Sequence, residues 1–207
     1  MRDFSIMESK ILRFFLGWHF LSMIFALVIG ISSGDFNLFL SLSIWTTIAV
    51  IAYKLEPSYY ILTAFVLSAL EELVVYSLGG GLQGAATSLL QDYANSLPIF
   101  LSIILVWRFV LGRYEVSEEE LYLVTIVPAA FIELLFQGLL FNPILLFLLG
   151  GPVFFIYASI MGSPKLPRGE GEFSLKIKVT TIVLMIAAIL VAAIIMSDVN
   201  NMLALSS

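Results

Sequence analysis

Three glutamates inside strongly hydrophobic stretches are the residues of this chain whose types and spacing suit chemistry. Glu71 and Glu72 are adjacent in one stretch, and Glu133 lies in another, followed one helical turn later by Gln137. If both stretches are helices that cross a membrane, a rise of about 1.5 Å per residue puts all three carboxylates at a similar depth. Carboxylates in the hydrocarbon region are costly and typically mark paths for protons or ions. The pattern therefore predicts a site that binds protons or cations.

The same acids have an alternative interpretation as bonds between helices. Three carboxylates at one depth, with no Lys or Arg beside them in the sequence, cannot all be ionised. A protonated glutamate can donate a hydrogen bond to a neighbouring helix or to a partner subunit. Both interpretations, an ion site and a helix contact, stay open at this stage.

The elements that position these acids are predicted to be transmembrane helices. The chain of 207 residues is 60% hydrophobic and 12% charged, which leaves too little polar surface for a water-soluble domain of this length. We expect an all-α, polytopic membrane helix bundle with about seven transmembrane helices, forming a single integral membrane domain over residues 1–207. The helices are expected at residues 11–31, 37–53, 58–78, 97–112, 121–141, 143–161 and 175–196.

The basic residues predict the orientation of the bundle. All ten Lys and Arg residues fall on one side of the membrane when seven crossings are counted, namely in the N-terminal segment and near residues 53–58, 108–120 and 162–178. Because basic connections stay in the cytoplasm, we expect a cytoplasmic N-terminus, an external C-terminus and a multi-pass protein of the cell membrane. The fifth helix begins on this side, where Ser117 and Glu120 have the spacing of a capping box.

A polar segment on the opposite side is predicted to lie over the acids. Residues 85–96 are too polar to span a bilayer and too patterned for coil, so we expect a short interfacial or re-entrant helix there, with Gln91 and Asp92 at its end. Gly80 and Gly84 have the spacing of small residues at close helix contacts. These four residues are therefore candidates for gating or for lining a cavity.

Two of the expected helices contain residues that break regular structure. Pro128 removes a backbone hydrogen bond from the fifth helix, and Gly150-Gly151-Pro152 is expected to interrupt the sixth. Half-helices of this kind can form a substrate or ion site, so Gly151 and Pro152 are further candidate cavity residues. The alternative is that these residues only kink the bundle.

Composition excludes several other kinds of chemistry. The chain has no cysteine and one histidine, His19, so disulfides, thiolate catalysis and multi-histidine metal sites are ruled out. We expect no metal and no cofactor, since no phosphate-binding loop or dinucleotide fingerprint is present. The chain has no basic face that could bind nucleic acid, so we expect no nucleic-acid partner. His19 is expected to hydrogen-bond between helices.

Residues 70–76 (Leu-Glu-Glu-Leu-Val-Val-Tyr), and less closely 132–138 (Ile-Glu-Leu-Leu-Phe-Gln-Gly), show a family resemblance. They resemble the first motif of the CAAX-protease and bacteriocin-processing membrane family, in which paired glutamates are followed by an aromatic residue, Arg and Gly. The resemblance implies glutamates that activate water together with histidines on later helices. In this chain Tyr76 or Gln137 stands at the Arg position, and no histidine follows His19. A non-catalytic relative is the more consistent interpretation.

Three functions from different classes follow from these patterns. The favoured one is a small transporter or channel that moves protons or cations through the intramembrane glutamates, and not an enzyme. The second is a non-catalytic integral subunit of a larger membrane complex. The third is a glutamate-dependent intramembrane protease lacking the usual histidines. Beyond the lipid bilayer, the expected partners are copies of the chain itself or other membrane subunits.

Overall fold

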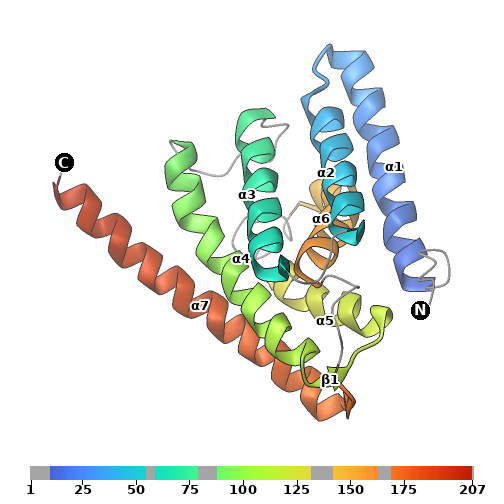
Figure 1. Ribbon diagram of the computed structural model, residues 1–207. Helices are drawn as coiled ribbons and strands as arrows, with labels where there is room; N and C mark the ends of the chain where they lie inside the picture. The colour runs from blue at the N-terminus through green and yellow to red at the C-terminus, as the bar shows by residue number, and fades with distance from the viewer. Residues whose placement is uncertain (1–9, 55–58, 79–87, 132–141, 163–168, 207) are drawn as a thin grey trace.

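The structure is a computed structural model, and it describes residues 10–54, 59–78, 88–131, 142–162 and 169–206 (Figure 1). These residues form an almost entirely helical bundle, as predicted. The helices are α1 (Lys10–Ser33), α2 (Asn37–Lys54), α3 (Tyr60–Leu78), α4 (Leu89–Leu111), α5 (Glu118–Ala130), α6 (Pro143–Gly162) and α7 (Leu175–Ser206). The only strands in this part of the chain are β1 (Tyr114–Glu115) and β2 (Gly171–Glu172).

Within the described residues, four helices are long and apolar enough to cross a membrane. They lie at Arg13–Ser33, Tyr60–Leu78, Leu89–Leu111 and Leu175–Met196. Shorter apolar helices lie at Asn37–Ala52 and Gly150–Ile160. The class of helical membrane protein is therefore supported by length and composition. The expected fifth helix is described only from Glu118 to Ala130, and its predicted later half lies outside the described residues.

The separate interfacial helix expected at residues 85–96 is not present, because α4 is continuous from Leu89 to Leu111. The Ser88 side chain caps this helix by accepting a hydrogen bond from the Gln91 backbone N–H at 3.2 Å. Pro98 lies inside α4 and does not end it. Every side chain from Gln91 to Ile99 is half-buried, since α4 packs against α3 and α7. This packing accommodates the polar residues at the start of α4, which were expected to be too polar for a helix that spans a bilayer.

The interruption expected at Gly150-Gly151-Pro152 is also absent, because α6 is one helix through these residues. The glycine serves a close helix contact instead. A Cβ atom at Gly151 would overlap the Trp18 ring of α1, and the Trp18 indole N–H donates a hydrogen bond to the Phe147 carbonyl at 2.6 Å. Every residue from Gly150 to Ile160 is buried. Because α6 contacts α1, α2, α3, α4 and α5, it is the central helix of the bundle (Figure 1).

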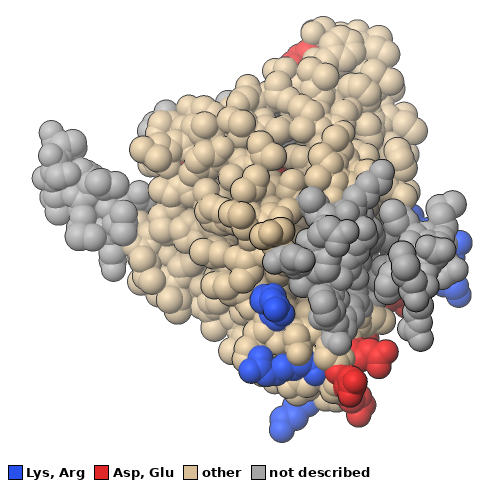
Figure 2. Space-filling model, in the orientation of Figure 1, with Lys and Arg blue, Asp and Glu red and all other residues tan. Residues whose placement is uncertain are grey.

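At one end of the bundle the α4–α5 and α6–α7 connections are joined. β1 pairs with β2 in parallel, with Tyr114 opposite Gly171. The Gly171 N–H donates to the Arg113 carbonyl at 3.1 Å, and a Cβ atom at Gly169 would overlap the Arg113 backbone. Two connections that the sequence predicts on the same side of the membrane therefore meet in space. Lys and Arg side chains gather at this end in Figure 2, with Asp and Glu side chains beside them.

The predicted capping box is present at the start of α5 and extends into an ion pair. Ser117 accepts from the Glu120 backbone N–H, and the Glu120 carboxylate accepts from the Ser117 backbone N–H at 2.9 Å. The same carboxylate lies 2.6 Å from the Lys178 ammonium of α7. Burial raises the pKa of the Glu120 carboxyl, but hydrogen bonds from Lys178 and Ser117 outweigh that effect and hold the pKa below its usual value. This carboxylate joins the first turns of α5 and α7.

A test of the central packing compares two glycine-to-alanine changes. We expect Gly151→Ala to lower the stability of the bundle by about 1–3 kcal/mol, because the added methyl group meets the Trp18 ring. Gly17→Ala is the matched control, since nothing lies within 4 Å of a Cβ atom at Gly17. Thermal unfolding of the detergent-solubilised protein, followed by circular dichroism, measures both. Equal melting temperatures for the two variants would contradict this packing.

The ion pair at the basic end predicts a dependence of stability on pH. Because the folded state lowers the pKa of Glu120, its contribution is present above the unfolded pKa of about 4.3 and is lost as the pH falls through the folded pKa. Glu120→Gln should remove this contribution, which we expect to be below about 1 kcal/mol because water reaches both side chains. Melting temperatures between neutral and acidic pH measure the effect. Glu115→Gln, which changes an exposed carboxylate, should keep the wild-type pH profile.

Candidate functional site

Glu71 and Glu72 are buried within α3. Their side chains are 4% and 9% exposed, and they continue a buried stripe of α3 that includes Ser68, one turn earlier. The helix can bury them because α3 packs against α2, α4 and α6. Both glutamates interact with other groups of the protein, so neither is an isolated charge. Both acids therefore lie against neighbouring helices of the bundle.

The first turns of α4 bring further polar groups to these acids. Asp92 and its neighbour Tyr93 are half-buried, and the carboxylates of Glu72 and Asp92 both lie within electrostatic range of the Tyr93 hydroxyl. α3 and α4 are in extensive contact. Glu72 of α3 and Asp92 of α4, two predicted site residues, therefore both act electrostatically on the Tyr93 hydroxyl. Gln91 directly precedes Asp92 in the sequence and is also half-buried.

Tyr93 is a member of this cluster that sequence reasoning missed. A tyrosine between an aspartate and an alanine carries no motif, so only the pairing of α3 with α4 reveals its place. We name Glu71, Glu72, Asp92 and Tyr93 the acidic cluster. The only salt bridge among the described residues joins Glu120 and Lys178, which are not members of this cluster.

The other predicted site residues are not brought to the acidic cluster by the described structure. Glu133, Gln137, Gly80 and Gly84 lie outside the described residues. Gly151 and Pro152 belong to α6, where Gly151 faces Trp18 of α1. Gly151 packs against α1, and Pro152 is buried within α6.

A second group of buried polar side chains lies between α1 and α2. His19 is fully buried, and its Nε2 atom lies 2.6 Å from the Thr46 hydroxyl, which confirms the predicted bond between helices. The Thr46 hydroxyl also lies 2.8 Å from the Leu42 carbonyl. A threonine hydroxyl has one proton, so both contacts are satisfied when Thr46 donates to Leu42 and His19 donates to Thr46. His19 Nδ1 then carries a lone pair, and it has no partner in the described part of the chain.

Neither a metal site within the described residues nor a known relative points to a function. No group of three His, Cys, Asp or Glu side chains placed to hold a metal ion occurs within the described ranges. The chain matches no protein-family model, no curated protein and no solved structure. Function must therefore be argued from the arrangement of the side chains.

In the assigned tautomer, the His19 Nε2–H group donates to the Thr46 hydroxyl, and this predicts the effect of removing that hydroxyl. Thr46→Val should leave a buried His19 N–H without a partner and lower stability by about 1–3 kcal/mol. Thr47→Val is the matched control, because its exposed hydroxyl only bonds the Ser43 carbonyl of the same helix. Thermal unfolding in detergent measures both variants. An effect as large in Thr47→Val as in Thr46→Val would contradict the assignment.

Proposed function

We propose that this protein is a small integral membrane transporter or channel that moves protons or cations through a site built on Glu71 and Glu72. The observation that carries the proposal is the burial of two adjacent carboxylates in the middle of a helix long and apolar enough to cross a membrane. Burying such groups is costly, and a binding role for protons or cations gives a reason to keep them. Glu133 and Gln137 are further proposed members of the site.

The proposal includes seven crossings, with the N-terminus in the cytoplasm, the C-terminus outside and the cell membrane as location. It is supported by the pairing of β1 with β2, which needs the α4–α5 and α6–α7 connections on the same side. The gathering of Lys and Arg side chains toward this end fits a cytoplasmic position (Figure 2). In this orientation the acidic cluster lies in the outer half of the bilayer.

The half-buried start of α4 supplies a polar route to the acids in this proposal. Gln91, Asp92, Tyr93 and Asn95 lie at the end of α4 remote from β1, and all are half-buried. Polar side chains at partial exposure can exchange protons or ions with water at the outer surface. They are therefore proposed to form the entrance, in place of the gate first expected from a separate interfacial helix.

The protease-like alternative gains no support from His19. This is the only histidine in the sequence, its side chain is fully buried, and its Nε2 atom is engaged by Thr46. Its ring packs against Phe155 of α6, with centroids 5.4 Å apart. A histidine held in this way is suited to joining helices.

Flux through reconstituted vesicles tests the proposed function. We expect Glu72→Gln and Glu71→Gln to abolish proton or cation flux while the helical content and melting temperature stay close to those of the wild type. Glu115→Gln changes an exposed carboxylate of β1 and should retain flux. A fluorescent pH indicator or a cation-sensitive dye inside the vesicles provides the measurement.

Two outcomes would contradict the transporter. Flux that persists in both glutamine variants would exclude a role for these acids. Absence of flux in the wild type, together with a stoichiometric foreign partner seen by native mass spectrometry of gently extracted protein, would favour the alternative of a non-catalytic subunit.

A further inference from the structure

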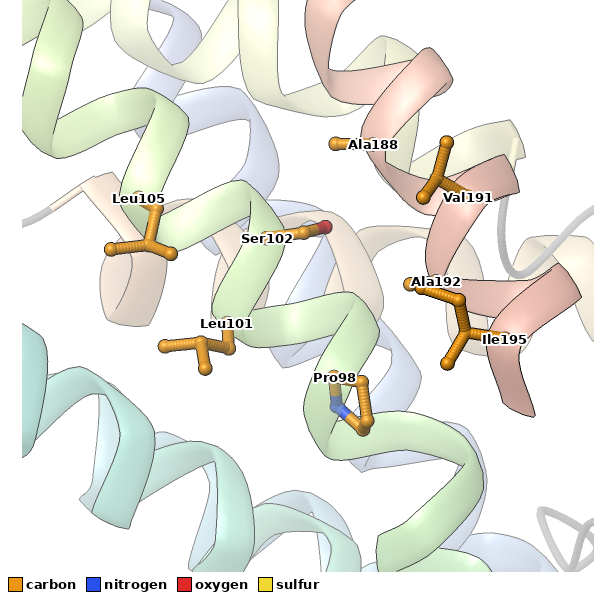
Figure 3. Close-up of a pocket in the computed structure, with 8 residues that line it drawn as sticks. All are labelled: Pro98, Leu101, Ser102, Leu105, Ala188, Val191, Ala192 and Ile195. Carbon is orange, nitrogen blue, oxygen red and sulfur yellow. The ribbon is translucent and has the colours of Figure 1, made fainter. Parts of the chain in front are cut away.

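An apolar groove runs between α4 and α7 (Figure 3). Its volume is about 340 Å³. It is open toward the outside of the bundle, and nearly all of its lining is hydrocarbon. Its walls include Pro98, Leu101 and Leu105 of α4 and Ala188, Ala192 and Ile195 of α7.

The side chains of the two helices explain why the groove is there. Ala188 and Ala192 are small and one turn apart on α7, so they leave space beside α4. The one hydroxyl of the lining, on Ser102, already donates to the Ile99 carbonyl at 2.7 Å. An occupant of the groove therefore meets an apolar surface without a polar group in need of a partner.

The α4 wall of the groove continues into a pair of arginines. Along a helix, Leu105 is followed on the same side by Arg108 and Phe109, and then by Gly112. Arg108 is exposed, and its Nη1 atom lies 3.2 Å from the position that a Cβ atom would take at Gly112. The Arg113 guanidinium lies 3.5 Å above the Phe109 ring and donates to the Phe109 carbonyl at 3.3 Å. Both guanidinium groups thus cover the last turn of α4.

Neither arginine is neutralised by a carboxylate of the described chain. The single ion pair among these residues uses Glu120 and Lys178. Guanidinium groups present several donors in a fixed fork that suits phosphate oxygens. The groove therefore ends, toward β1, in two exposed arginines that form no salt bridge within the described residues.

We propose that the α4–α7 groove and the last turn of α4 bind an anionic phospholipid of the leaflet at the β1 end. The phosphate lies on the Arg108 and Arg113 guanidinium groups, and an acyl chain runs past Leu105 toward Pro98. From Arg108 to Pro98 the helix rises by about 15 Å, which is half of a hydrocarbon core about 30 Å thick. The acyl chain of a lipid in one leaflet is therefore about as long as the stretch of α4 from Arg108 to Pro98.

Charge decides between a lipid and a second protein helix as occupant. A helix of a partner or of another copy could also cover the apolar walls. It would leave both guanidinium groups without an anionic partner from α4, whose one acid, Asp92, lies at the opposite end of the helix. An anionic lipid satisfies the apolar walls and the guanidinium groups together.

Native mass spectrometry of the full chain, reconstituted with equal amounts of phosphatidylglycerol and phosphatidylcholine, tests the proposal. We expect the wild type to retain phosphatidylglycerol preferentially. Arg108→Gln combined with Arg113→Gln should reduce that preference by at least about fivefold, as expected for basic groups at an anionic membrane surface. Lys10→Gln combined with Arg13→Gln removes equal charge from α1, which lies apart from α4 and α7, and should keep it (Figure 1).

Further variants test the groove itself. Ser102→Phe places a ring in the groove and should reduce retention of both lipids. Equal retention of the two lipids by the wild type, or an equal loss in the α1 control, would overturn the proposal. Displacement of the lipid by inorganic phosphate at similar concentration would overturn the role of the acyl chain. A disulfide-linked dimer of Leu105→Cys in native membranes would do the same, since the chain has no other cysteine.

Discussion

The rest of the structure depends on the burial of α6. This helix has no polar face, and in its second half every side chain from Gly150 to Ile160 is buried. A helix that is hydrophobic all round must be enclosed on all sides, and α1 to α5 all contact it. The enclosure requires Gly151, because only a residue without a Cβ atom lets Trp18 lie against the helix. The helices around α6 in turn fix the pairing of α3 with α4, and hence the acidic cluster.

Neutral hydrogen bonds already join the helices around this core. Trp107 of α4 donates to the Thr125 hydroxyl of α5 at 3.0 Å, Tyr122 of α5 lies 3.1 Å from Ser159 of α6, and His19 binds across α1 and α2. Such pairs hold membrane helices together at little cost. Carboxylates are expensive by comparison. The bundle therefore has cheaper means of joining its helices than Glu71 and Glu72, and this contrast favours a binding role over a purely structural one.

Local signals predicted the parts of the fold that depend on local chemistry. The capping box at Ser117 and the start of α7 at Leu175 agree with the structure, because caps and hydrophobic runs act within a few residues. The predictions were wrong where the local structure depends on contacts with residues far away in the sequence. Gly151 was expected to interrupt a helix, but its missing side chain lets Trp18 of α1 pack against α6. Residues 85–96 were expected to be too polar to span a bilayer, but residues 89–96 belong to α4, which packs against α3. Tyr93 could not be foreseen, because its neighbours are set by the α3–α4 contact.

The distribution of charge ties the proposed function to the proposed orientation. Basic groups gather toward the β1 end, beside Glu115, Glu172 and the ion pair of Glu120, whereas Asp92 begins α4 at the opposite end. Basic residues resist transfer across the membrane, so the proposed orientation keeps the β1 end in the cytoplasm during insertion. In that proposed orientation the acidic cluster faces the outside, where it would draw protons or cations from the external solution. The same asymmetry that orients the bundle thus also decides the side from which its proposed site is loaded.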